Sequence, residues 1–162
     1  MLAEFYIPLS AVCFTLLGLW LIAALTRQAG WRGSSLYRQR AYAVALHFSL
    51  PGLMGLLALI NPDSAGLWRV SFGVAATGGA VALIALRAPA AGKLGLAAYI
   101  AAIAAFVLVV ILAIKPHIVG LLGFDVAPER IEAVLLTGLV FAGVNVAWLL
   151  LFENAERGAA SS

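Results

Sequence analysis

The residues best suited to chemistry lie in the segment His-Phe-Ser-Leu-Pro-Gly, at positions 47–52 of a long apolar run. Pro51 has no backbone N–H, so it cannot donate to the carbonyl oxygen of His47, four residues earlier in a helix. His47 therefore combines a freed carbonyl oxygen with an imidazole. A helix kinked here could bind a small ligand or a cation. The alternative is a kink that serves packing, with His47 bonded to a neighbour or directed toward the membrane surface.

Two further polar residues could complete such a site. Ser49 lies in the same segment, and Asn145 lies within another apolar run. Asn145 could face His47 across one cavity, so the candidate ligand-binding residues are His47, Ser49, Pro51 and Asn145. The alternative for Asn145 is a hydrogen bond between helices, with Ser49 or Thr77 as its partner, which contributes roughly 0.6–2 kcal/mol in a membrane.

Residue sets for other kinds of chemistry are missing from the sequence. The two histidines, His47 and His117, are predicted to lie on opposite sides of the bilayer, so they cannot share a metal ion or a haem. Cys13 is the only cysteine, which excludes an intrachain disulfide and favours a packing role. The motifs G-x-S-x-G, H-E-x-x-H, C-x-x-C and the phosphate-binding loop do not occur. We therefore expect no cofactor, no metal and no catalytic residues.

Five apolar runs must position these residues, and they fill most of the chain. The chain has 162 residues, of which 64% are hydrophobic and 10% are charged, with a mean hydropathy of +1.07. Each run is close to the roughly 20 residues that an α-helix needs to cross a bilayer. The runs do not alternate between apolar and polar residues as barrel strands do. They predict an all-α polytopic membrane protein, a single domain over 1–162 with spans at about 5–26, 41–60, 67–86, 94–114 and 131–152.

The positions of lysine and arginine predict the orientation of the bundle, because cytoplasmic loops are enriched in both. One side of the membrane should hold Arg27, Arg32, Arg38, Arg40, Arg87, Lys93 and Arg157, and the other only Arg69, Lys115 and Arg130. We therefore expect the N-terminus outside and the C-terminus in the cytoplasm, in a multi-pass protein of the cell (inner) membrane. This placement accounts for the net charge of +3, so no nucleic-acid partner is expected. The four arginines of the loop 27–40 could contact anionic lipid headgroups.

Turn residues predict which spans are neighbours. The loop 61–66 reads Asn-Pro-Asp-Ser-Ala-Gly and the loop 88–93 reads Ala-Pro-Ala-Ala-Gly-Lys, so spans two and three, and spans three and four, should form hairpins. The loop 115–130 is longer and apolar, which predicts an interfacial segment, a re-entrant one or a partner-binding surface. Pro128 should begin the fifth helix outside the hydrocarbon, where Glu129 and Glu132 suit the positive end of the helix dipole.

Small residues at four-residue spacing mark helix faces that can approach closely. Such stripes occur in spans three, four and five, for example at Ser71, Ala75 and Gly79. They predict close packing among these three spans, and they are also the pattern of a dimer interface.

The leading hypothesis for function is non-enzymatic: a small membrane protein that assembles with itself or serves as an accessory subunit of a membrane complex. The small-residue stripes, the apolar loop and the lack of charge in the middle of the spans favour it. The alternative is a small-ligand-binding or transport protein with a cavity at the kink between His47 and Pro51. An intramembrane enzyme is the third hypothesis, and it would need a polar cluster within the spans.

Overall fold

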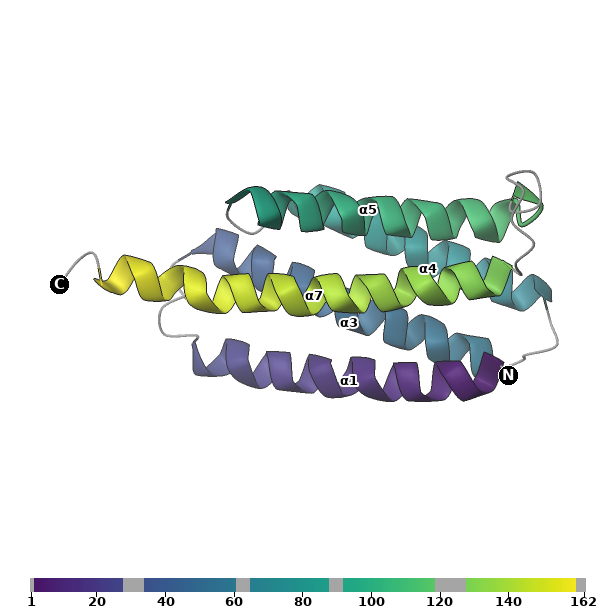
Figure 1. Ribbon diagram of the computed structural model, residues 1–162, viewed down its shortest axis with the longest axis horizontal. Helices are drawn as coiled ribbons and strands as arrows, with labels where there is room; N and C mark the ends of the chain where they lie inside the picture. The colour runs from purple at the N-terminus through teal and green to yellow at the C-terminus, as the bar shows by residue number, and fades with distance from the viewer. Residues whose placement is uncertain (1, 28–33, 61–64, 88–91, 119–127, 160–162) are drawn as a thin grey trace.

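The computed structural model describes residues 2–27, 34–60, 65–87, 92–118 and 128–159 (Figure 1). These residues form five long helices: α1 (Leu2–Thr26), α3 (Ser35–Ile60), α4 (Ala65–Leu86), α5 (Gly92–Ile114) and α7 (Pro128–Ala159). All five are long and apolar enough to cross a membrane. A helix can do so because it satisfies its backbone N–H and C=O groups internally. The predicted all-α class is therefore confirmed, with five helices that are each able to span a membrane.

Two helix boundaries differ from the predicted spans by more than three residues. α3 begins at Ser35, so Arg38 and Arg40 lie in its first turns and not in a loop. α7 begins at Pro128, as predicted, but continues to Ala159, beyond the predicted end at 152. An apolar run measures only the part of a helix that suits hydrocarbon, whereas the helix itself continues wherever polar residues keep their helix propensity. The predictions for the loops at 61–64, 88–91 and 119–127 lie outside the described residues.

Four helices form a ring in chain order, and α1 packs outside it, at the edge of the bundle in Figure 1. α3 packs against α4, α4 against α5 and α5 against α7, and α7 closes the ring against α3. α1 packs mainly against α3 and touches α7 slightly. The hairpins predicted for α3 with α4 and for α4 with α5 are therefore confirmed. The prediction that α4, α5 and α7 all pack closely together is confirmed only for α5, which contacts both of the others, because α4 and α7 lie across the ring from each other. The most buried helix is instead α3.

The two ends of the bundle differ in charge. The N-terminal end holds the start of α1 and, from the other helices, Arg69, Lys115 and Arg130. The opposite end, which we call the basic end, holds Arg27, Arg38, Arg40, Arg87 and Lys93.

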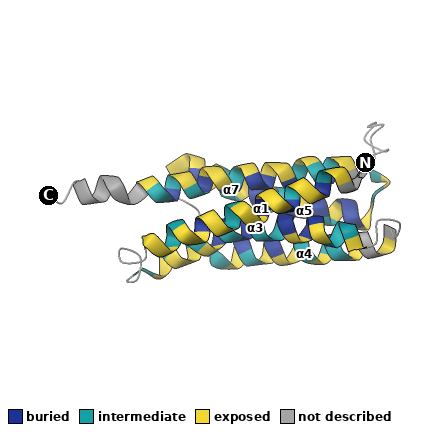
Figure 2. Ribbon diagram, turned by 90° about the horizontal axis from the view of Figure 1, so that it is seen from below, coloured by how far each residue is buried: buried dark blue, intermediate teal, exposed yellow. Residues whose placement is uncertain are grey.

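The core and the outer surface are both apolar. Each ring helix contributes a large side chain to the main buried cluster, namely Met54, Phe72, Phe106 and Leu136. Figure 2 shows buried residues where helices meet and exposed residues along their outer sides. Exposed hydroxyls bond within their own helix; Thr15 donates to the Ala11 carbonyl oxygen at 2.8 Å, for example. Such bonds satisfy the polar groups of an apolar surface of the kind that can face lipid.

The contact between α1 and α3 is close because α3 presents glycines to α1. A Cβ atom on Gly55 would lie 2.3 Å from Ser10 Oγ, and one on Gly52 would lie 3.0 Å from the Cβ of Cys13. Ser10 Oγ donates to the Gly52 carbonyl oxygen at 3.1 Å. Nearer the basic end, Trp20 Nε1 donates to the Ala41 carbonyl oxygen at 2.9 Å. Small residues and hydrogen bonds of this kind hold helices together in lipid, where burial alone gives no driving force.

Candidate functional site

His47 lies at the midpoint of the 26-residue α3 and is buried, with 2% of its surface exposed. Its Nδ1 is 2.7 Å from the carbonyl oxygen of Ala43, one turn earlier. A proton on Nδ1 makes this a donated hydrogen bond and leaves Nε2 as an acceptor. Nε2 is buried and has no hydrogen-bond partner among the described residues. His47 therefore does not reach the membrane surface, and its unpaired acceptor costs about 1–3 kcal/mol.

The surroundings of His47 are closely packed. A Cβ atom on Gly143 of α7 would lie 2.5 Å from the His47 Cβ and 2.9 Å from Cε1 of Phe48. Pro51, one turn further along α3, is also buried. The structure thus places His47 in the layer between α3 and α7, where the backbone of α7 passes directly against the histidine.

Asn145 lies on a different face of the bundle from the buried His47. Asn145 is exposed on α7, and its Nδ2 donates to the Phe141 carbonyl oxygen at 2.8 Å. It follows Gly143 by two residues, which turns it about 200° around the helix and away from His47. Ser49 is half-buried on α3. The hydroxyl of Thr77, predicted as a partner for Asn145, donates instead to the Gly73 carbonyl oxygen within α4 at 2.6 Å.

Glu132 is a buried ionisable residue that sequence reasoning missed. The sequence predicts only that it suits the positive end of the helix dipole, and the structure shows it wholly buried in the second turn of α7. It begins an inward-facing stripe that continues through Leu136, Leu139 and Gly143. Gly143 packs on His47. Glu132 lies about 16 Å from Gly143 along the axis of α7, with the two leucines between them. The regular spacing of this stripe places Glu132 on the same face of α7 as the two leucines. This spacing predicts that Glu132 is buried only once the inward face of α7 is known.

The arginines predicted to contact lipid headgroups lie at the basic end. Arg38 is exposed, and so is Arg27, whose Nη1 donates to the Leu151 carbonyl oxygen of α7 at 2.5 Å. Arg40 is half-buried, with its guanidinium carbon 5.9 Å from the centre of the Tyr37 ring. Arg32 lies outside the described residues. Among the described residues, no group of three or more histidine, cysteine, aspartate or glutamate side chains could hold a metal ion.

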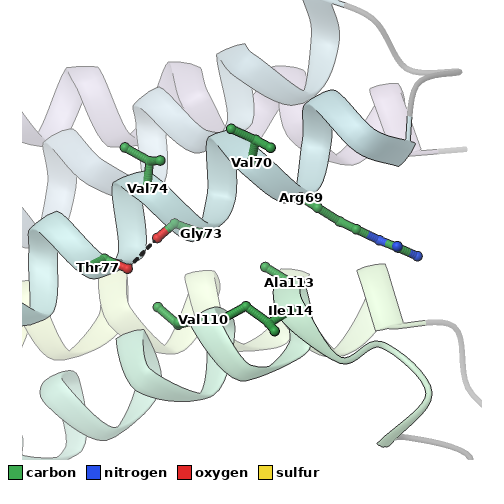
Figure 3. Close-up of a pocket in the computed structure, with 8 residues that line it drawn as sticks. All are labelled: Arg69, Val70, Gly73, Val74, Thr77, Val110, Ala113 and Ile114. Carbon is green, nitrogen blue, oxygen red and sulfur yellow. Dashed lines mark hydrogen bonds between the residues drawn. The ribbon is translucent and has the colours of Figure 1, made fainter.

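A groove of about 470 Å³ lies between α4 and α5 and opens at their outer surface (Figure 3). Its walls come from one face of α4 and from the last turns of α5: Arg69, Val70, Gly73, Val74, Thr77, Val110, Ala113 and Ile114. Arg69, at one end, is the only charged residue that lines it, and its side chain extends past Ile114 toward the N-terminal end of the bundle. The groove is therefore apolar along its length and basic at its mouth.

The outward face of α7 carries a second regular stripe, on the side of the helix away from His47. Its members are all exposed and are spaced alternately by four and three residues: Val134, Gly138, Phe141, Asn145, Trp148 and Phe152. The rings of Trp148 and Phe152 contact each other, with centroids 4.5 Å apart and planes inclined by 38°. We call this set the α7 outward stripe.

Known proteins offer no further guide to the site. No protein-family model, no curated protein and no solved structure matches this chain.

Proposed function

We propose that the protein is a non-enzymatic membrane subunit that assembles with a second copy of itself through the α7 outward stripe. The observation that carries the proposal is Asn145, an amide exposed toward lipid in the middle of an apolar face. Its Nδ2 bonds to Phe141 within α7, and no described residue bonds to its Oδ1. An amide left partly unsatisfied in hydrocarbon is costly, so a partner that completes its hydrogen bonds is favoured.

The spacing of the α7 outward stripe fits two helices packed side by side. Residues separated alternately by four and three positions stay on one face of a helix that pairs with another. In a twofold-symmetric pair the same patch lies on both copies, so Asn145 of one copy would meet Asn145 of the other. Gly138, which has no atom within 4 Å of where its Cβ would be, leaves room for a close approach on this face.

The pair of aromatic rings extends the same face toward the basic end. Trp148 and Phe152 are both exposed there and their rings contact each other. Flat aromatic groups add contact area between helices at a low cost in side-chain entropy. The stripe therefore combines close approach at Gly138, a hydrogen bond at Asn145 and aromatic contact at Trp148.

The charge distribution supports an orientation for this assembly. The basic end carries the larger share of lysine and arginine, so we place it in the cytoplasm and the N-terminus outside, in the cell (inner) membrane. The same stripe could receive a different membrane protein as its partner, which would make the chain an accessory subunit.

Energy transfer between labelled copies in lipid vesicles tests the self-assembly. Transfer should persist as the protein is diluted with lipid. Asn145→Ala should weaken the association about three- to thirtyfold, which corresponds to roughly 0.6–2 kcal/mol for the hydrogen bond. Thr15→Ala on α1 removes another exposed polar group bonded within its helix and should leave the association unchanged. A monomeric wild-type protein at every dilution would contradict the proposal.

A second candidate function rests on His47. Its buried Nε2 without a partner could accept a proton or a donor group of a small ligand, and intramembrane ionisable residues often serve transport. The test is proton entry into vesicles loaded with a pH-sensitive dye. Transport through His47 predicts a flux above that of protein-free vesicles, lost in His47→Ala. A wild-type protein that conducts no protons would count against a proton path.

A further inference from the structure

The groove between α4 and α5 lies on an outer surface that lipid molecules surround in a membrane. Both helices are long and apolar enough to span the membrane, and the groove opens at their outer surface. From Arg69 to Thr77 it extends about 12 Å along α4, less than half of the roughly 30 Å hydrocarbon thickness. Its length therefore fits part of one acyl chain from the leaflet at the N-terminal end of the bundle.

The floor of the groove depends on a glycine. A Cβ atom on Gly73 would lie 3.7 Å from the Cβ of Ala113, so α4 and α5 meet here through two small residues. Val70, Val74, Val110 and Ile114 form the apolar walls. The one hydroxyl in the lining, that of Thr77, already donates to the Gly73 carbonyl oxygen. The body of the groove therefore offers contact to a hydrocarbon chain and no hydrogen bond to a polar ligand.

The mouth of the groove is charged. Arg69 is exposed, and no hydrogen bond or ion pair joins it to another described residue. It begins the apolar part of α4, which places it at the level of the headgroups. Lys115 directly follows Ile114, a lining residue, and is also exposed. Two cations beside an acyl-sized groove complement a lipid that carries a net negative charge.

We propose that this groove binds an anionic phospholipid, with the phosphate beside Arg69 and one acyl chain against Gly73. An arginine can donate two parallel hydrogen bonds to a phosphate group. A zwitterionic phospholipid also offers a phosphate, but it carries no net negative charge. The preference for the anionic lipid therefore comes from Arg69 and Lys115, and the retention of the chain comes from the groove. The site is independent of the α7 outward stripe, which lies on another helix.

Spin-labelled lipids measure both parts of the proposal. The protein is placed in phosphatidylcholine vesicles with a trace of tail-labelled phosphatidylglycerol or phosphatidylcholine, and the immobilised fraction of each label is compared. The wild-type protein should prefer phosphatidylglycerol. Arg69→Gln should reduce that preference about fivefold, the effect of one basic residue near the surface. Arg87→Gln, directly after the other end of α4, removes an equal charge away from the groove and should reduce the preference less.

A glycine pair tests the groove itself. Gly73→Leu should fill the groove and lower the immobilised fraction of both labels. Gly78→Leu is the matched control, since no atom lies within 4 Å of its Cβ position and it is outside the groove. Equal losses in Arg69→Gln and Arg87→Gln would overturn the headgroup site. Equal effects of Gly73→Leu and Gly78→Leu would overturn the acyl-chain site. A change of oligomeric state with Gly73→Leu alone would also overturn it, because it would indicate that a second copy of the protein occupies the groove.

Discussion

Gly143 and His47 are in such close contact that a single methyl group on the glycine would come within 2.5 Å of the histidine Cβ. Real Cβ atoms do not approach so closely, so α7 can pass His47 only because residue 143 has no side chain. This contact closes the ring of helices between α3 and α7. It also fixes the inward face of α7 and, with it, the opposite face on which Asn145 lies.

The first prediction follows from this contact. Gly143→Ala should destabilise the protein by about 1–3 kcal/mol, because either α7 or α3 must move to relieve the overlap. Gly78→Ala, on an exposed face with open space, should be neutral or slightly stabilising, since alanine favours helix. The free energy of unfolding of each variant in detergent micelles checks this. Equal stability of the two variants would mean that α3 and α7 are not in close contact.

The second prediction concerns the contact of α1 with α3. Gly55→Ala should be destabilising because its Cβ would lie 2.3 Å from Ser10 Oγ, and rotating the hydroxyl away would break its bond to Gly52. Ser10→Ala removes that oxygen, so the double variant should be less destabilised than the sum of the single ones. A double-mutant cycle should give a coupling of about 0.5–3 kcal/mol. Strict additivity would show that the two residues do not meet.

The third prediction separates folding from assembly with two tryptophans. Trp20→Phe loses the hydrogen bond to the Ala41 carbonyl oxygen and should cost about 0.5–1.5 kcal/mol of folding stability, with no effect on association. Trp148→Phe changes an exposed ring of the α7 outward stripe, so it should weaken association and leave the stability of the monomer unchanged. Unfolding in micelles and energy transfer in vesicles measure the two effects. If both substitutions alter only the stability, or both alter only the association, Trp148 and Trp20 do not have these separate roles.

The sequence predicts the number of helices well, but not the faces through which they pack. Long apolar runs identify spans because hydrocarbon excludes polar backbone, and short turns identify α3 with α4, and α4 with α5, as neighbours. Within a span, however, residues that face lipid are as apolar as residues that face the core. On α7, Phe141 faces outward and Leu139 inward, and nothing in their chemistry separates them.

The same limit explains the errors at the candidate site. His47 and Asn145 are both polar residues in apolar runs, which favours one shared cavity, yet one is buried and the other exposed. Glu132 lies close to a span boundary, where charge is ordinary, so its complete burial depends on the rotation of α7. The packing of α7 on its neighbours, including that of Gly143 against His47, determines this rotation.

Cysteine cross-linking in the native membrane tests the central claim, self-assembly through the α7 outward stripe, most directly. In a Cys13→Ala background, Phe141→Cys, at a position 70% exposed on α7, is compared with Val81→Cys, at a position 59% exposed on α4. The two positions lie at similar depth, since they follow Arg130 and Arg69 by similar numbers of residues. Mild oxidation should give a disulfide-linked dimer from Phe141→Cys and little from Val81→Cys. Equal cross-linking from both positions, or none from Phe141→Cys, would contradict the account.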